Sequence, residues 1–302
     1  MSKLTVLGER TRKPDCPIFT SKASLETEGP MAGGGMGGIR RSKISVVIPA
    51  HNEENNVRGA IENTGKAITC NPRIGDYEII AINDGSRDGT GRIIDEVASK
   101  DGRVTAVHHE KPHNFGGCYK EGIMRAKFEN FAVVPGDNEQ KQDTLIKTFG
   151  QVGGNAEIVL GFTTNAWIRP RSRQFISLMY VIANNWLYDL DLKYYNGISV
   201  YPTEVLRDMA NGMPADFAFF AYCAVKALKS GHSYKEIPVE IKPIKPMFKT
   251  SATRWRNVFG VAKSSLDLFM DVKVKDPLRP LIWMERKNDK KPVCLNDDSL
   301  YS

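Results

Sequence analysis

Three short segments of this sequence place carboxylates beside small residues and turn-forming residues. They are residues 49–54, 83–88 and 135–140, and each follows a run of apolar residues. Carboxylate oxygens accept hydrogen bonds from ligand hydroxyl and N–H groups, and hard divalent cations prefer oxygen ligands. Glycine and other small residues let the backbone approach a ligand closely. These segments are therefore the first candidates for a functional site, provided that the fold brings them together.

The elements that would position the three segments alternate between strands and helices. Short β-branched or apolar runs predict buried strands, and helical spacing of apolar residues predicts helices between them. The expected strands are 44–48, ended by Pro49, and 77–82, 104–108 and 131–134, and the expected helices are 53–69, 91–100 and 117–127. This order predicts an α/β fold with a mostly parallel sheet and right-handed crossovers. Ligands of such sheets bind beyond the carboxyl ends of the strands, where all three segments would lie.

The second half of the chain is less regular. We expect a strand at 158–160, a helix at 175–192, an edge strand at 239–241 between two prolines, and a terminal amphipathic helix at 257–274. Residues 1–42 lack apolar periodicity and include the glycine-rich segment 31–38, which predicts a disordered tail and linker rather than a targeting peptide. The predicted domains are therefore 1–42 (tail), 43–260 (α/β domain) and 261–302 (helical element and polar tail).

Composition narrows the class of protein. The chain has 302 residues, a formal charge of +7 and 41% apolar residues, which suit a globular domain with anionic partners. Five scattered cysteines without a CxxC pair argue against a zinc site or a disulfide framework, and they favour a reducing compartment. We find no apolar run of 18 residues and no signal-peptide core. We therefore expect a cytoplasmic protein, with peripheral contact to the cytoplasmic membrane face as a further expectation.

Two long motifs resemble the nucleotide-sugar signatures of family 2 glycosyltransferases. They are Val46-Val-Ile-Pro-Ala-His-Asn-Glu-Glu54 and Tyr77-Glu-Ile-Ile-Ala-Ile-Asn-Asp-Gly-Ser-Arg-Asp-Gly-Thr90, and the similarity extends from Lys43 to about Gly260. The resemblance implies the GT-A fold, a Rossmann-like three-layer α/β sandwich. It also implies a UDP- or GDP-sugar donor and an inverting, metal-dependent transfer of a hexose.

The resemblance implies which residues bind the donor. Small residues could lie against the base, carboxylates could bind base or ribose, and a glycine turn opens the third helix near the nucleotide. The implied donor-binding residues are Pro49, Ala50, Asn52, Glu53, Asp84, Gly85, Ser86 and Gly117. Two alternatives stay open: Glu53 is an exposed carboxylate in the first turn of a helix, or Asp84 only caps a turn.

The segment Val134-Pro-Gly-Asp-Asn-Glu-Gln140 lies where the family has its Asp-x-Asp metal motif. Aligned without gaps, Asp137 takes the second Asp position and Pro135 the first. Glu139 falls two residues later, so Asp137 and Glu139 are the expected ligands of Mg²⁺ or Mn²⁺. A gap would bring in Gln140, and a solvated acidic turn is the alternative. The nearby His108, His109 and His113 are interpreted as solvated loop residues without a fixed Asp or Cys partner.

The acceptor side resembles the branch that makes dolichyl- or polyprenyl-phosphate sugars. The resemblance lies in Arg173–Ser177, Tyr195–Tyr201 and Lys229–Pro238, followed by the basic segment Lys249–Arg256. Basic side chains would hold a phosphate acceptor, which is already ionised near neutral pH and needs no general base. The expected acceptor-binding residues are Arg173, Ser177, Lys249, Ser251 and Arg256, with Arg254 in a catalytic role.

Two alternatives to a lipid acceptor stay open. A hydroxyl of a glycan or other soluble acceptor would need a base, for which Asp216 is the candidate. A basic nucleic-acid-binding module is the alternative from a different class, because Trp255 lies between two arginines. That hypothesis leaves both nucleotide-sugar motifs unexplained, so we expect no nucleic-acid partner.

The predicted helix 175–192 carries apolar residues on one face. Their spacing of three and four favours packing in the core: Phe175, Leu178, Met179, Ile182, Trp186 and Leu187. The alternative is an interfacial helix with Trp186 and Tyr188 at the depth of lipid headgroups and Arg169–Arg173 on anionic lipid.

Overall fold

The computed structural model describes residues 41–214 and 218–243, together with Leu268 and Met270. The expected tail 1–42 lies almost entirely outside these residues, and so does nearly all of the expected C-terminal element 261–302. Leu268 is buried in the core of the domain.

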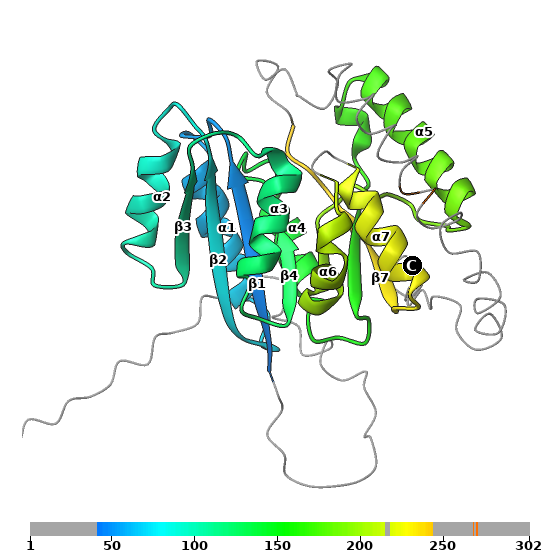
Figure 1. Ribbon diagram of the computed structural model, residues 1–302, viewed down its shortest axis with the longest axis horizontal. Coiled ribbons are helices and arrows are strands. Elements are labelled where there is room, and N and C mark those ends of the chain that lie inside the picture. The colour runs from blue at the N-terminus through cyan, green and yellow to red at the C-terminus, as the bar shows by residue number, and fades with distance from the viewer. Residues whose placement is uncertain (1–40, 215–217, 244–267, 269, 271–302) are drawn as a thin grey trace, which may run out of the picture. The chain divides into compact units, whose positions relative to one another are not determined.

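Seven strands form one sheet in the order β3-β2-β1-β4-β6-β5-β7 (Figure 1). They are β1 (Ser42–Ala50), β2 (Ile74–Asp84), β3 (Val104–His109), β4 (Asn130–Val133), β5 (Ile158–Thr163), β6 (Ser199–Pro202) and β7 (Tyr234–Val239). β6 runs antiparallel to both of its neighbours, β4 and β5, and the other paired strands are parallel. The prediction of an α/β fold with a mostly parallel sheet is confirmed.

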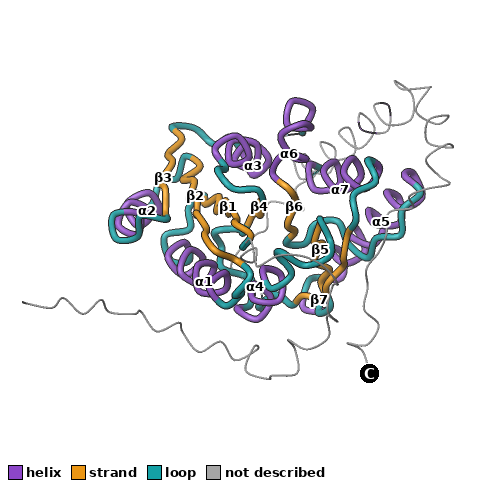
Figure 2. The backbone as a smooth tube through the Cα atoms, turned by 90° about the horizontal axis from the view of Figure 1, so that it is seen from below, coloured by secondary structure: helices purple, strands orange, loops and turns teal. Residues whose placement is uncertain are grey.

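Helices cover both faces of the sheet and make three layers. α1 (Val57–Thr69) and α4 (Gln142–Phe149) lie on one face, while α3 (Asn114–Arg125), α6 (Thr203–Met209) and α7 (Phe219–Lys229) lie on the other (Figure 2). α2 (Thr90–Ala98) lies beside the edge strand β3, and the long helix α5 (Arg171–Tyr188) connects β5 to β6.

The core forms where β-branched and aromatic residues of the sheet meet the helices. Residues 45–50 of β1 are all buried, since this strand lies in the middle of the sheet with a helix layer on each side. α3 packs unusually close to β1, because a Cβ at Gly122 would lie 2.2 Å from Val47 Cγ2. Tyr119 of α3 then contacts Phe131 and Phe219, with ring centroids 5.2 and 4.5 Å apart. This packing fixes the height of α3 relative to the carboxyl ends of β1 and β2.

Several predicted boundaries are wrong, each for a local reason. Pro49 does not end the first strand: it pairs with Ile82 of β2, and its carbonyl accepts the N–H of Gly136 beyond the end of β4. The first helix begins at Val57, because the carbonyl of Glu53 binds the N–H groups of Asn56 and Val57 in a preceding turn.

Two elements of the second half are also displaced from their predicted ranges. The long helix runs from 171 to 188 and ends where Asp189 adopts a left-handed conformation with φ of 51°. The edge strand is β7, five residues earlier than expected, with Pro238 inside it; its place at the edge of the sheet is confirmed. Among the described residues, no helix combines the length and apolarity needed to cross a membrane.

Candidate active site

The carboxyl ends of β1 and β2 are held together by their own polar residues. The N–H of Asn52 donates to Ser86 Oγ (2.9 Å), and the N–H of Arg87 donates to Asn52 Oδ1 (2.9 Å). Asn52 and Gly85 take positive φ values of 56° and 65°, which a short polar residue and glycine tolerate. The first two motifs therefore form one rigid edge, as expected from their positions after neighbouring parallel strands.

The third motif lies directly on the end of β1. The N–H of Gly136 donates to the carbonyl of Pro49 (3.0 Å), and a Cβ on Gly136 would lie 2.8 Å from Ala50 Cβ. Only glycine allows this approach, which brings Asp137 to the end of the first motif. Pro49 and Ala50 are buried at this point, so in this structure their side chains pack beneath the edge formed by the ends of β1 and β2.

Three carboxylates gather at this point: Glu53, Asp137 and Glu139. Burial raises the pKa of Asp137, and the backbone N–H of Glu139 (3.0 Å from Asp137 Oδ1) only partly offsets it. Burial also raises the pKa of Glu139, and the charge of Asp137 raises it further. Burial and then the nearby charge of Asp137 raise the pKa of Glu53, against a hydrogen bond from Asn56. We call Glu53, Asp137 and Glu139 the acidic group.

Three basic residues act on the acidic group: Arg173, Lys242 and Arg169, whose charge acts on Glu139. The charge of Arg173, in the first turn of α5, acts on both Asp137 and Glu139, and the charge of Lys242 acts on Asp137. Lys242 Nζ donates to the carbonyl of Asn138 (2.7 Å), so it also fixes the loop that carries the acidic group. The structure thus brings Arg173 to the metal motif, while Ser177 lies one helical turn further along α5 and is half-buried.

The acidic group has the chemistry of a divalent-cation site. Its carboxylates raise one another's pKa, so a bound cation would relieve their repulsion, and oxygen ligands suit Mg²⁺ and Mn²⁺. In the described part of the chain, the clusters with three protein donors near one point both contain His109, and neither contains Asp137. A cation at the acidic group would therefore need further oxygens from a ligand.

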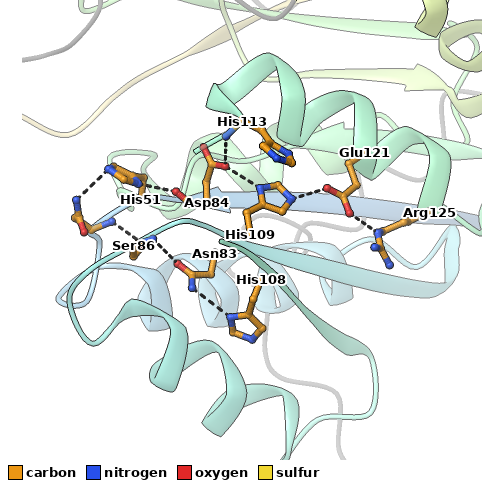
Figure 3. A network of polar contacts seen from close by, with 10 residues as sticks. His51, Asn83, Asp84, Ser86, His108, His109, His113, Glu121 and Arg125 are labelled. Carbon is orange, nitrogen blue, oxygen red and sulfur yellow. Dashed lines mark hydrogen bonds and ion pairs between the residues drawn. The ribbon is translucent and has the colours of Figure 1, made fainter. Parts of the chain in front are cut away.

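The interpretation of the histidines as solvated loop residues is wrong for His109. Its side chain is 5% exposed, and its Nδ1 and Nε2 contact Asp84 Oδ1 (2.8 Å) and Glu121 Oε2 (2.5 Å) (Figure 3). The reason is the strand register, which pairs His109 of β3 directly with Asp84 of β2. His108 is exposed, but it also has fixed partners: its Nε2 contacts Asp95 (2.9 Å), and its Nδ1 contacts the side-chain amide of Asn83 (3.2 Å).

The side chain of Asp84, an expected donor-binding residue, is buried below the surface of the binding edge. Its carboxylate is buried, and Oδ1 also accepts the N–H of His113 (2.7 Å) just before α3. Its carbonyl accepts a hydrogen bond from His51 Nδ1 (2.7 Å). Gly117 lies in the first turn of α3, where a Cβ would meet His113 Cβ at 2.8 Å, so its small size serves the packing of this turn.

The sequence did not single out the contacts that join these residues. The signal that the sequence offers for His109 is its position, directly after a predicted strand at the binding edge. Five predicted site residues lie outside the described part of the chain: Asp216, Lys249, Ser251, Arg254 and Arg256.

The expectation that the apolar face of α5 packs in the core is wrong for most of its residues. Leu187 does pack against the core. The others are largely exposed, and we call them the α5 face: Phe175, Leu178, Met179, Ile182 and Trp186, which is 81% exposed. Tyr188, expected at headgroup depth, is instead fully buried. The helix therefore presents one face to its surroundings from Phe175 to Trp186. Its other side packs in or against the core through Tyr180, Val181, Asn184, Leu187 and Tyr188.

A family model, "Glycosyl transferase family 2", matches residues 45–207, more than half of the chain. The chain belongs to glycosyltransferase family 2. It is an enzyme of that family, and the two motifs, the acidic group and Arg173 all lie within the matched range.

Curated relatives include proteins named for a polyprenol monophosphate sugar or for undecaprenyl phosphate. "Polyprenol monophosphomannose synthase" of Mycolicibacterium smegmatis is 24% identical over 207 residues, covering 64% of this chain and 75% of that protein. "Glycosyltransferase GlyG" of Streptococcus pneumoniae is 31% identical, but the match covers 39% of this chain and 38% of GlyG. An "Undecaprenyl-phosphate 4-deoxy-4-formamido-L-arabinose transferase" of Proteus mirabilis is 24% identical over 46% of this chain and 43% of its own length. The chain thus spans less than half of two of these relatives.

Solved structures with the same architecture are GT-A glycosyltransferases. The mannosyltransferase PcManGT of Pyrobaculum calidifontis, in complex with GDP-Man and Mn²⁺, has a TM-score of 0.57 and 18% identity, over 81% of this chain and 69% of that one. Glucosyl-3-phosphoglycerate synthase of Mycobacterium tuberculosis, in complex with Mg²⁺ and UDP, has a TM-score of 0.55 and 15% identity, over 79% and 84%. These similarities show the GT-A fold of this chain.

Proposed function

We propose that this enzyme transfers a hexose from a UDP- or GDP-sugar to a polyprenyl phosphate, with inversion and with a divalent cation. The observation that carries the proposal is the acidic group with Arg173 beside it, at the edge where the two nucleotide-sugar motifs meet. Relatives named for polyprenyl-phosphate substrates and solved neighbours in complex with nucleotides and Mn²⁺ or Mg²⁺ support it.

Each part of the site has a role in this reaction. Asp137 and Glu139 would hold the cation, which supplies positive charge to the leaving diphosphate. Glu53 is half-buried at the same edge and is the carboxylate best placed to accept hydrogen bonds from the donor. The segment Asp84–Ser86 forms the rim against which the nucleoside would lie. Arg173 would bind the acceptor phosphate next to the donor, since guanidinium binds phosphate through two parallel hydrogen bonds.

A phosphate acceptor fits the charges around Arg173. A phosphate monoester is largely a dianion at neutral pH, because its second pKa is about 6. It can therefore attack without losing a proton to a protein base. The guanidinium of Arg173 already faces Asp137 and Glu139. A phosphate bound to it would therefore also be directed toward the reacting end of the donor.

We infer that the α5 face lies on the lipid surface that carries this acceptor. Its five large apolar side chains follow Arg171, which is exposed at the start of the same helix, so apolar contact and positive charge adjoin on one helix. A helix of this kind lies in the interface of an anionic membrane with its apolar side chains among the acyl chains. The acceptor phosphate would then be at the level of Arg173.

The experiment is a nucleotide-release assay with a panel of UDP- and GDP-sugars, with and without polyprenyl phosphate in vesicles. We expect release that needs both the lipid phosphate and Mn²⁺ or Mg²⁺, and that stops in EDTA. Full turnover in EDTA would refute the metal assignment. Rapid turnover with a soluble hydroxyl acceptor and none with the lipid would refute the acceptor and favour Asp216 as the base.

A further inference from the structure

His109 lies between two carboxylates at the end of β3. Its Nδ1 faces Asp84 Oδ1 of β2, and its Nε2 faces Glu121 Oε2 of α3 (Figure 3). A neutral imidazole has one N–H and can donate to only one of the two carboxylates, whereas an imidazolium donates from both nitrogens. With the His109 side chain 5% exposed, water cannot readily replace either partner. The geometry therefore assigns His109 a positive charge.

The other groups around His109 agree with this charge. The ring of His113 stacks on it with centroids 4.0 Å apart, and Arg125 donates to Glu121 from the far side (2.8 Å). The buried Cys118 lies near Asp84, and burial followed by the charge of Asp84 raises the pKa of its thiol, so it stays neutral. Burial lowers the pKa of His109, but the hydrogen bonds with its two carboxylate partners outweigh burial and raise it overall.

The same contacts hold the binding edge together. Asp84 Oδ1 accepts from both His109 Nδ1 and the His113 N–H, so one oxygen joins β2, β3 and the start of α3. The carbonyl of Asp84 accepts from His51 of the first motif. The loop before α3 packs on Gly85, where a Cβ would lie 2.8 Å from Pro112 N. Loss of the charge on His109 would leave one of its two carboxylates without a donor and so weaken the links among β2, β3 and α3.

We propose that His109 is a positioning residue: its imidazolium fixes Asp84 and the start of α3 so that the rim Asp84–Ser86 can bind the nucleoside of the donor. This inference rests on the proposed nucleotide-sugar function and extends it to a pH limit. Since the pKa of His109 is raised above its ordinary 6.5, the stabilisation is fully present below pH 6.5. It is lost as the pH rises through the raised value.

A metal ion would not explain the arrangement as well. The two carboxylates contact opposite nitrogens of one ring, so a single ion cannot bind both of them together with His109. The direct contact with Asp84 at 2.8 Å has instead the length of a charge-assisted N–H···O hydrogen bond, and the contact with Glu121 is shorter still.

Two variants separate charge from hydrogen bonding. His109→Asn can keep a donor toward Asp84, and His109→Gln can keep one toward Glu121, but neither carries a charge. His232→Asn is the matched control, because this histidine also pairs with a carboxylate, Glu157 (3.1 Å), but lies before β7, at the opposite end of the sheet from the binding edge. The measurements are calorimetric binding of UDP and GDP with Mn²⁺ from pH 6 to 9.5, and NMR titration of the histidine ring protons.

We expect the wild type and His232→Asn to lose about tenfold in nucleotide affinity at alkaline pH. Both His109 variants should bind about tenfold more weakly at pH 6.5 and show no further alkaline loss. Donor KM should rise in them more than kcat falls. The NMR signal that disappears in His109→Asn should titrate above 6.5 in the wild type.

Three results would overturn the proposal. One is a His109 signal that titrates at or below 6.5. Another is nucleotide binding by both His109 variants with the affinity and pH dependence of the wild type. A shift in the His109 signal on addition of Zn²⁺ at stoichiometric concentration, with loss of the pH effect, would assign the cluster to a metal instead. A wild type that binds neither UDP nor GDP at any pH would refute the proposed function itself, and this inference with it.

Discussion

Replacing Asp137 with asparagine tests the cation site through stability as well as through activity. The substitution keeps the shape of the side chain and removes one negative charge from the acidic group. Burial raises the pKa values of Glu53, Asp137 and Glu139, and neighbouring carboxylates raise those of Glu53 and Glu139 further. Each group therefore gives its stabilisation at low pH and loses it as the pH rises through its raised pKa. At pH 7 the metal-free protein therefore holds these charges at a cost, and Asp137→Asn should have an equal or higher Tm than the wild type.

Added metal should reverse this order of Tm values, because it should stabilise the wild type more than Asp137→Asn. A ligand present at 100 times its Kd stabilises the folded state by about 2.7 kcal/mol. For a domain of about 200 residues, each kcal/mol shifts Tm by roughly 2–4 °C, so Mn²⁺ with UDP or GDP should raise the Tm of the wild type by about 5–10 °C. Asp137→Asn should lose most of this shift, and its turnover should fall at least about 10²-fold.

Thermal denaturation followed by circular dichroism, with and without Mn²⁺ and nucleotide, measures both effects. Asp143→Asn is the control, since it makes the same chemical change at an exposed position in the first turn of α4. The control should keep both the metal-induced shift and the turnover. The reasoning is refuted if Asp137→Asn keeps the full metal-induced shift, or if its metal-free form melts many degrees below the wild type. The second result would mean that the carboxylate stabilises the fold.

The remaining predictions concern the acceptor side. Arg173→Ala should raise the KM for the acceptor phosphate at least about tenfold with little change in nucleotide affinity, whereas Arg171→Ala, on the exposed side of the same turn, should change it less than threefold. Exchange of Phe175 and Trp186 for serine should abolish co-sedimentation with anionic vesicles and leave Tm within a few degrees, because both side chains are exposed. Met124→Ser, at an exposed position of α3, is the control, and vesicle binding by the double variant equal to that of the wild type would refute the role of the α5 face.

The first half of the fold could be predicted because its signals are local. β-branched runs, turn residues after them and helical spacing between them indicate four parallel strands, and parallel strands bring their following loops to one edge. This is why Asn52, Glu53, Ser86 and Asp137 lie together as expected.

The second half could not be predicted in the same way. β6 has four residues and lies between β4 and β5, although α5 separates it from β5 in sequence. Eight of the eleven residues of α7 are buried, so it has no polar face whose period would reveal a helix. The apolar period of α5 does predict a helix, but the same period is expected for a helix packed on the core and for one whose apolar face is exposed.

The network around His109 depends on a register that sequence does not reveal. Asp84 and His109 are 25 residues apart and become neighbours only because β2 and β3 pair in one particular parallel register. A shift of one residue would have placed His108 beside Asp84 and turned His109 toward the opposite face of the sheet.

The acidic group and His109 set opposite pH limits on one binding edge. As the pH falls through the raised pKa values of Asp137 and Glu139, protonation removes the charge that would hold a cation. As the pH rises through the raised pKa of His109, its imidazolium loses the positive charge that fixes Asp84 in the rim Asp84–Ser86. Turnover should therefore follow a bell-shaped pH profile whose two sides arise from different residues. His109→Asn should flatten only the alkaline side, while excess Mn²⁺ should move only the acid side to lower pH. A profile in which both changes affect the same side would show that the two groups do not act independently, and the division of the site into a metal half and a nucleoside half would then be wrong.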